Sequence, residues 1–165
     1  MVILGLDPGS RHTGYGVVEE RGDRLVALDF GRISAGRGSD LPQRLAHLSR
    51  ELTALLERHR PQATALETAF HGVNSRSLIV LAQARGALLA TVAGHTAEVR
   101  EYSPAQVKSA VSGNGRADKR QVERMVRLIL DLPGARLSAD AADALAVAIC
   151  CSRRLAFERL AETAD

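Results

Sequence analysis

The chain has 165 residues, of which 45% are hydrophobic and 25% charged, and its formal net charge is +3. This composition is typical of a globular protein and excludes a disordered chain. The length suffices for one domain, residues 1–165, but not for two ordinary ones. The basic excess favours a polyanionic partner without requiring one.

Leaders, membrane spans and disulfides are not expected. The first residues, "MVILGLD", have no basic leader region, and no apolar run approaches ~18 residues. The two cysteines, Cys150 and Cys151, are adjacent in a helical pattern, where neighbouring side chains point apart and form a poor disulfide. We therefore expect a reduced, cytoplasmic protein.

The first half of the chain predicts strands around one amphipathic helix. Val2–Asp7 is almost entirely apolar without alternation, as in a strand buried on both faces. The helix begins after the cap residue Asp40, carries leucines at helical spacing and ends before Pro61. Further strands are expected at Gly14–Glu20, Arg24–Ser34 and Ala63–Glu67.

The second half predicts four helices and a fifth strand. The first helix, 75–93, is apolar on almost every side, and the strand follows at 97–102. Ser103 begins the next helix with the features of a capping box, Asp118 precedes a helix over about 119–130, and Ser138 begins the last. Three early strands followed by alternating helices and strands predict a single three-layer α/β domain.

Four carboxylates stand out by their positions. Asp7 and Glu67 each end an apolar strand, and they meet at one sheet edge if those strands are neighbours. Asp140 and Asp143 are three residues apart and share one helix face. Each has a plainer reading: Asp7 as a turn residue, Glu67 as a charged strand end, Asp140 as a first-turn acid that suits the helix dipole.

A divalent metal would explain these acids if they converge, because none has a basic partner nearby in the sequence. Mg²⁺ and Mn²⁺ prefer carboxylate oxygens and keep positions open for phosphate and water. Two such ions ~3.5–4 Å apart can activate a water and stabilise a leaving oxygen. Convergence itself does not follow from these residues alone.

The chain resembles the RuvC family of bacterial Holliday-junction resolvases, within the RNase H-like, retroviral-integrase superfamily. The resemblance rests on "ILGLDPGSRHTGYGV", "ALETAF", "LAQARGALLA", "EYSPAQVKSAVSGNGRADKRQV" and "DAADALAVAI", in order over nearly the whole chain. It implies an RNase H-like three-layer fold with a five-stranded mixed sheet flanked by helices. It also implies a homodimer that nicks two opposed strands of a four-way DNA junction and works with the branch-migration proteins RuvA and RuvB.

The resemblance also implies residue roles. The catalytic and metal-binding acids fall on Asp7, Glu67, Asp140 and Asp143, with two Mg²⁺ or Mn²⁺ ions per active site. Lys119 matches a family lysine that stabilises charge at the scissile phosphate, and Lys108 matches one that binds the DNA backbone. Phe70 is expected to stack on an unpaired base at the junction centre, although a core aromatic at a strand end is its alternative. Asn74 and Arg76 follow it as further candidate DNA contacts.

A basic stripe supports DNA binding independently of the resemblance. Arg116, Arg120, Arg124 and Arg127 fall on one side of the fourth helix and the turn before it, although an ordinary solvated face is the alternative. The glycine-rich "SGNGRADK" before this helix offers backbone N–H groups to a phosphate. The all-round apolar helix 75–93 is expected to be the dimer interface, and burial within one domain is its alternative.

Three rival functions remain at this stage. An actin-like ATPase shares the first hairpin but needs two copies of the core, and this chain has no repeat. An RNase H-like nuclease of the YqgF type, acting on RNA, shares the "DPG" strand, but "DAADALA" and "GNGRADK" favour the resolvase. A non-catalytic junction binder gains nothing from four carboxylates that face phosphates.

Overall fold

The computed structural model describes residues 1–9, 11–34, 40–68, 75–96 and 98–163. Its sheet has five strands in the order β3-β2-β1-β4-β5. The β1–β2 and β2–β3 pairs are antiparallel, whereas β4 pairs in parallel with both β1 and β5. The strands are β1 Val2–Asp7, β2 His12–Arg21, β3 Arg24–Ser34, β4 Ala63–Glu67 and β5 Glu98–Tyr102. The predicted five-stranded mixed sheet is confirmed.

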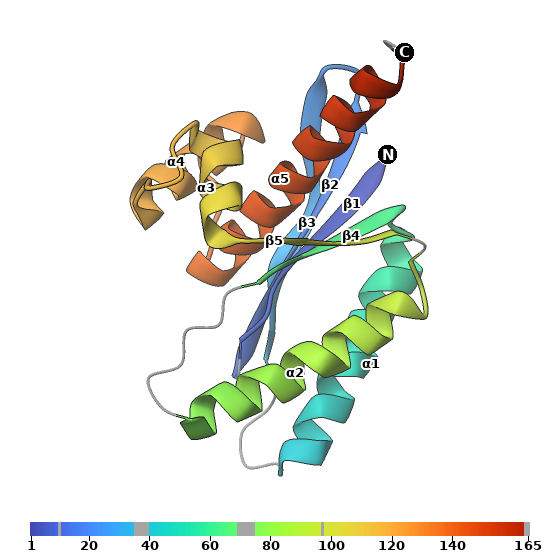
Figure 1. Cartoon of the computed structure of the whole chain (residues 1–165). Helices are drawn as coiled ribbons and strands as arrows, with labels where there is room; N and C mark the ends of the chain where they lie inside the picture. The colour runs from blue at the N-terminus through green and yellow to red at the C-terminus, as the bar shows by residue number, and fades with distance from the viewer. Residues whose placement is uncertain (10, 35–39, 69–74, 97, 164–165) are drawn as a thin grey trace.

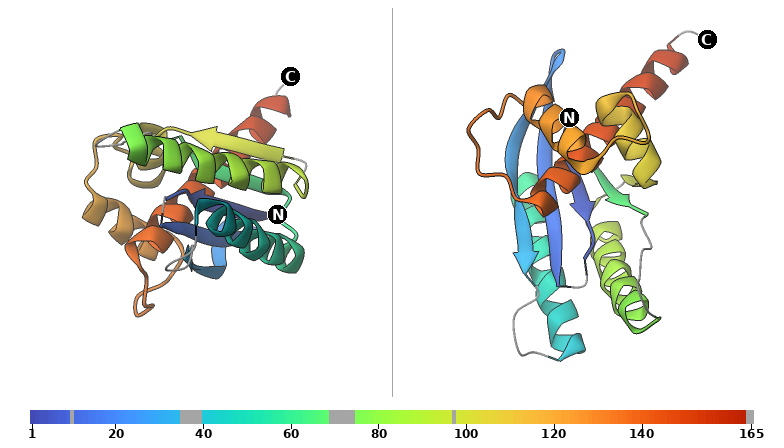
Figure 2. Two further views of the ribbon diagram at one scale, coloured as in Figure 1. Left: turned by 90° about the horizontal axis from the view of Figure 1, so that it is seen from below. Right: turned by 90° about the vertical axis from the view of Figure 1, so that its left-hand side faces the viewer.

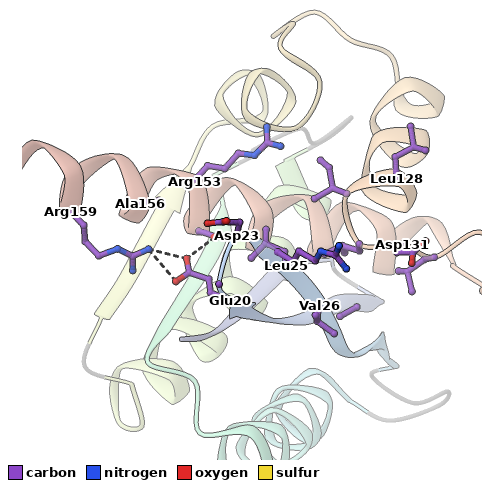
Figure 3. A pocket seen from close by; sticks show the side chains of 16 residues that line it. Glu20, Asp23, Leu25, Val26, Leu128, Asp131, Arg153, Ala156 and Arg159 are labelled. Atoms are coloured by element: carbon purple, nitrogen blue, oxygen red, sulfur yellow. Dashed lines mark hydrogen bonds and ion pairs between the residues drawn. The ribbon is translucent and has the colours of Figure 1, made fainter.

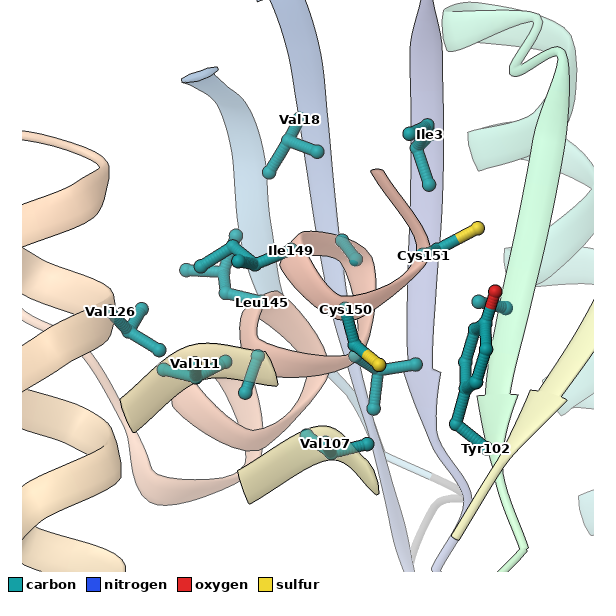
Figure 4. Close-up of a cluster of buried hydrophobic side chains, with 14 of the residues drawn as sticks. Ile3, Val18, Tyr102, Val107, Val111, Val126, Leu145, Ile149, Cys150 and Cys151 are labelled. Atoms are coloured by element: carbon teal, nitrogen blue, oxygen red, sulfur yellow. The ribbon is translucent and has the colours of Figure 1, made fainter. Parts of the chain in front are cut away.

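Helices cover both faces of this sheet (Figures 1 and 2). α1 and α2 pack on one face, where the core includes Leu4, Leu52 and Leu88. α3, α4 and α5 pack on the other, and Figure 4 shows α5 within a cluster that includes Ile3 and Val126. The helices are α1 Leu41–His59, α2 Ser75–Ala93, α3 Pro104–Ser112, α4 Lys119–Ile129 and α5 Ala139–Glu162. The alternation of Ile3 and Leu4 between two cores shows why β1 lacks a polar face.

Local capping signals set the helix starts. The side chains of Asp40 and Ser138 accept hydrogen bonds from backbone N–H groups of the first turns of α1 and α5. Ser103 and Asp118 form complete capping boxes at the starts of α3 and α4. All four starts therefore lie where the sequence predicts them. α5 continues to Glu162, and near this end Arg159 pairs with Glu20 of β2.

α2 is buried on only one of its sides within this chain. Its inner face carries Ala84, Leu88 and Val92, whereas Leu78 and Ile79 are 38% and 59% exposed. Burial on both sides within one domain, the alternative raised by the sequence, is therefore wrong. By length and composition alone α2 also qualifies as a membrane span, with a mean hydropathy of 1.3, which the sequence reading did not anticipate. Its inner face packs into the same core as α1, so within this chain α2 is a layer of the fold.

Both cysteines are buried and free on α5. Burial raises the pKa of both thiols, to about 11, so they remain protonated near neutral pH. Figure 4 shows both within the α5 core cluster. Both cysteines therefore pack in the core as small apolar side chains.

Candidate active site

The register of the central parallel strands brings two of the predicted acids to one edge. Leu6 of β1 lies opposite Leu66 of β4, so Asp7 and Glu67 follow at the same end of neighbouring strands. Both residues are partly exposed, whereas the residues before them are buried. The condition on which the sequence argument depended, that these two strands are neighbours in one sheet, is therefore met.

Glycines on β1 and β2 let α5 bring the other two acids to this edge. Gly14 lies opposite Asp7, and a Cβ atom built on Gly14 would lie 2.0 Å from the backbone oxygen of Asp140. A Cβ on Gly5 would lie 2.1 Å from the backbone oxygen of Ala144, also on α5. Any larger residue at either position would push the helix away from the strands. The glycines of "LGLDPGSRHTGYG" therefore set the distance between α5 and the strand that carries Asp7.

One pocket of about 450 Å³ collects most of the proposed catalytic groups. Asp7, Glu67 and Asp143 line it together with Lys108 of α3 and Lys119 of α4. Its described lining does not include Asp140, which lies at the start of α5, about one turn before Asp143. The structure thus gathers three of the four predicted acids and both predicted lysines in one cavity.

The surroundings of Asp7 disfavour its charged form. Burial first, and then the charges of Asp143, Glu67 and Asp140, raise the pKa of Asp7 from its ordinary 3.8 to about 7, although Lys119 acts in the opposite direction. A carboxylate surrounded by three others attracts a cation strongly. The carboxylates therefore form an anionic pocket whose charge the neighbouring lysines only partly offset.

Lys119 supplies a counter-ion that the sequence did not reveal. Its Nζ atom lies 2.6 Å from Oδ2 of Asp143, and this hydrogen bond raises the pKa of Lys119. The Lys119 side chain is nevertheless 71% exposed. Since α4 and α5 are separate helices, the pairing depends on how they pack.

The chemistry of the donor set suits a hard divalent cation, because the pocket offers carboxylate oxygens beside open space. Across the parts of the chain that the structure describes, however, no three His, Cys, Asp or Glu side chains are arranged to hold one ion. One of the acids, Asp143, is instead paired with Lys119. The carboxylates must turn toward the pocket centre before several of them can share an ion.

The predicted DNA-binding residues differ in their surroundings. Arg120 and Arg124 are exposed on α4, and Arg116 is exposed in the turn before it. Arg76 is exposed in the first turn of α2, and Lys108 is half-buried at the pocket. Phe70 and Asn74 lie outside the described residues.

Arg127 does not belong to the DNA-facing stripe that the sequence suggested. Its guanidinium binds Oε1 of Glu123 on the same helix. It also donates to the backbone oxygens of Leu132 and Ala135 in the turn after α4. These contacts tie Arg127 to the end of its own helix, so the stripe ends at Arg124.

Sequence reasoning missed Arg85 of α2. This residue is only 6% exposed, and its Nη1 atom donates to the backbone oxygen of Glu67 at 2.7 Å. The signal was available, because Arg85 stands inside the apolar run "LIVLAQARGALL". A charge inside such a run is rarely buried without a specific partner.

A larger cavity, of about 960 Å³, shares no lining residue with the carboxylate pocket. Figure 3 shows the side chains that line it. The β2–β3 hairpin, the end of α4 and the second half of α5 form its walls. Glu20 in its lining accepts a hydrogen bond from Ser152 and pairs with Arg159. Its lining contains none of the predicted site residues, so it is not the candidate active site.

The sheet order and the acidic edge define a class: an α/β protein of the RNase H-like type with carboxylates at the ends of its central strands. A family model for "Crossover junction endodeoxyribonuclease RuvC" matches residues 3–151. The chain belongs to this family. The protein of that name from Geotalea uraniireducens is 49% identical over 152 residues, which cover 91% of this chain and 87% of the relative.

Solved structures agree with the sequence relatives. The structure of Thermus thermophilus RuvC matches with a TM-score of 0.83 and 33% identity, over 94% of this chain and 97% of that one. A second structure, of T. thermophilus RuvC in complex with Holliday junction substrate, matches with a TM-score of 0.83 and 30% identity, over 94% and 96% of the two chains. The predicted family and fold class are confirmed.

Proposed function

We propose that this chain is a metal-dependent endonuclease that resolves four-way DNA junctions by paired, symmetric nicks. The observation that carries the proposal is the convergence of Asp7, Glu67 and Asp143 with Lys108 and Lys119 in one pocket. Membership of the crossover junction endodeoxyribonuclease family names the substrate class. The T. thermophilus relative was solved with a Holliday junction.

The acids hold the reaction centre in this proposal. Two Mg²⁺ or Mn²⁺ ions would be held here, one by Asp7 with Asp143 or Asp140 and the other by Asp7 with Glu67. Bound metal supplies an activated water and charge stabilisation at the leaving 3′-oxygen. The raised pKa of Asp7 supports this role, because a crowded carboxylate gains most from a nearby cation.

The basic residues hold the substrate. Lys119 stabilises charge on the scissile phosphate in this proposal, which its exposed side chain beside Asp143 supports. Lys108 lines the same pocket and binds the neighbouring backbone. Contacts farther out come from Arg76, Phe70 and Asn74 on one side and from Arg116, Arg120 and Arg124 on the other. Such contacts position the DNA and make its binding sensitive to salt.

Two symmetric nicks require two active sites, so we infer a homodimer. The exposed apolar face of α2, with Leu78 and Ile79, is the proposed interface. Each protomer acts as a single domain over 1–165, in the cytoplasm, together with RuvA and RuvB.

The test is cleavage of a mobile four-way junction with Mg²⁺, Mn²⁺ or EDTA, with the cuts mapped to nucleotide positions. We expect paired nicks at symmetric positions with either metal and none with EDTA. An RNA hairpin in the same assay tests the YqgF-type alternative. Faster cutting of the hairpin than of the junction would replace the resolvase proposal with an RNA nuclease.

Asp7→Asn separates cutting from binding. We expect it to abolish cleavage while leaving junction affinity in EDTA largely intact, because binding rests on phosphate contacts. Cleavage at a near wild-type rate would refute the role of Asp7.

A further inference from the structure

Arg85 is a buried cation on the inner side of α2. Its side chain is 8% exposed, and its Nη2 atom lies 2.7 Å from Oε1 of Glu101 on β5. Its Nη1 atom donates to the backbone oxygen of Glu67 at 2.7 Å. One guanidinium therefore joins the middle of α2 to the ends of β4 and β5.

Arg85 binds the carbonyl of Glu67 at the end of β4. Glu67 is the last residue of β4, and the backbone N–H of the next residue, Thr68, donates to Tyr102 at the end of β5. Arg85 binds the carbonyl between these two residues and so holds the last peptide plane of the strand.

This peptide plane includes the Cα and carbonyl carbon of Glu67, so the contact restrains the backbone from which the Glu67 side chain projects. A backbone carbonyl and a carboxylate require two donors in a fixed fork, which a guanidinium has and an ammonium lacks. Burial strengthens the restraint, because the charge has little access to water if the contacts break. The backbone of Glu67 is thus held by a contact from α2 in addition to the hydrogen bonds of the sheet.

We propose that Arg85 is a positioning residue that holds Glu67 in the metal-binding pocket and makes α2 part of the support of the active site. The inference rests on the proposed function in one respect, namely that Glu67 is a metal ligand. Arg85 touches neither metal nor DNA in this scheme and acts only through Glu67. Because α2 is also the proposed dimer helix, its inner face supports the pocket while its outer face meets the partner.

The test measures Mn²⁺ binding to the full-length protein by the electron paramagnetic resonance signal of free Mn²⁺. Residues that orient metal ligands typically change affinity by about 10- to 100-fold when replaced. We expect Arg85→Met to weaken Mn²⁺ binding by about 10-fold and Arg85→Lys, which keeps the charge and one donor, to weaken it less. Junction binding in EDTA stays at the wild-type level.

A double-mutant cycle shows whether the effect passes through Glu67. In the Glu67→Gln background, Arg85→Met should cause no further loss of Mn²⁺ affinity. Leu88→Ala is the matched control on the same buried helix face. It should lower thermal stability while leaving Mn²⁺ affinity unchanged.

An equal loss from Arg85→Met in the wild-type and Glu67→Gln backgrounds would overturn the inference, as would weakened Mn²⁺ binding by Leu88→Ala. If Arg85→Met does not fold, Arg85→Lys and Glu101→Gln serve in the same cycle, since Glu101 is 44% exposed. If Glu67→Gln alone leaves Mn²⁺ affinity and cleavage unchanged, the assignment of Glu67 in the proposed function fails. If Glu67→Gln weakens binding and Arg85→Met does not, only the positioning role fails.

Discussion

Neutralising Asp7 should stabilise the metal-free protein while it destroys cleavage. Burial and the neighbouring carboxylates raise the pKa of Asp7 from 3.8 to about 7. Between these values the folded protein keeps a proton that the unfolded chain releases. The folded state then binds more protons, so the free energy of unfolding falls as pH rises from about 4 to about 7. Above pH 7 the folded state carries the full cost of the charged carboxylate.

The size of the effect follows from the pKa change. At 1.36 kcal/mol per pH unit, the difference between 3.8 and 7 corresponds to about 4 kcal/mol as an upper limit. Water in the open pocket screens part of this cost, so we expect Asp7→Asn to raise the free energy of unfolding by about 1–2 kcal/mol at pH 8. The gain should disappear as pH falls toward 4, where Asp7 is neutral in the wild-type protein.

Urea denaturation in EDTA at pH 4, 6 and 8 measures the effect, with Glu57→Gln on the exposed face of α1 as the control. The control should show no comparable pH-dependent gain. Millimolar Mn²⁺ should stabilise the wild-type protein at pH 8 but stabilise Asp7→Asn far less. A variant that is no more stable than the wild type at pH 8, or equally stabilised at pH 4, would refute the account of Asp7.

The other predictions concern packing, backbone strain and assembly. Gly14→Ala should displace the start of α5, lower stability by about 1–3 kcal/mol and reduce cleavage by about 100-fold, whereas Gly134→Ala, which meets open space, should change neither. Arg60, at the end of α1, has a φ of 43°, so Arg60→Gly should raise the free energy of unfolding by about 0.5–1 kcal/mol; a lower melting temperature would contradict this. Ile79→Glu should give a monomer by sedimentation at micromolar concentration, whereas Leu160→Glu on α5, where the wild-type leucine is also exposed, should remain dimeric; a dimer in both variants would contradict the α2 interface.

The predicted elements agree closely with the structure because local signals define them. Capping residues Ser103 and Asp118 fix helix starts, and the apolar run of β1 needs no distant partner to be recognised. The boundary errors have a different origin. β2 begins at His12 rather than Gly14 because His12 pairs with Ser34 across the hairpin, and pairing rather than composition ends a strand.

The acids of the site were predictable, but their environment was not. Asp7 and Glu67 stand out because each ends an apolar strand, and Asp140 and Asp143 because they share one helix face. The family motifs then assign the four acids their roles. By contrast, the same basic sequence stripe contains Arg124, which is exposed, and Arg127, which is tied to Glu123 and to backbone oxygens. Spacing on a helix gives a shared side, but neighbouring segments decide which charges stay available.

The sequence alone determined the α/β alternation, the helix starts, the strand-end carboxylates and the family, because each depends on residues close together in the chain. Only the tertiary structure placed Lys119 against Asp143, Arg85 beneath Glu67, and α5 directly upon Gly5 and Gly14. These contacts join segments that are distant in sequence, and they exist only once helices and sheet pack. The stretch Leu4–Gly16 illustrates the difference. Its pattern predicts a strand that ends in an acid, but only the packing of α5 against Gly5 and Gly14 explains why these positions are glycines.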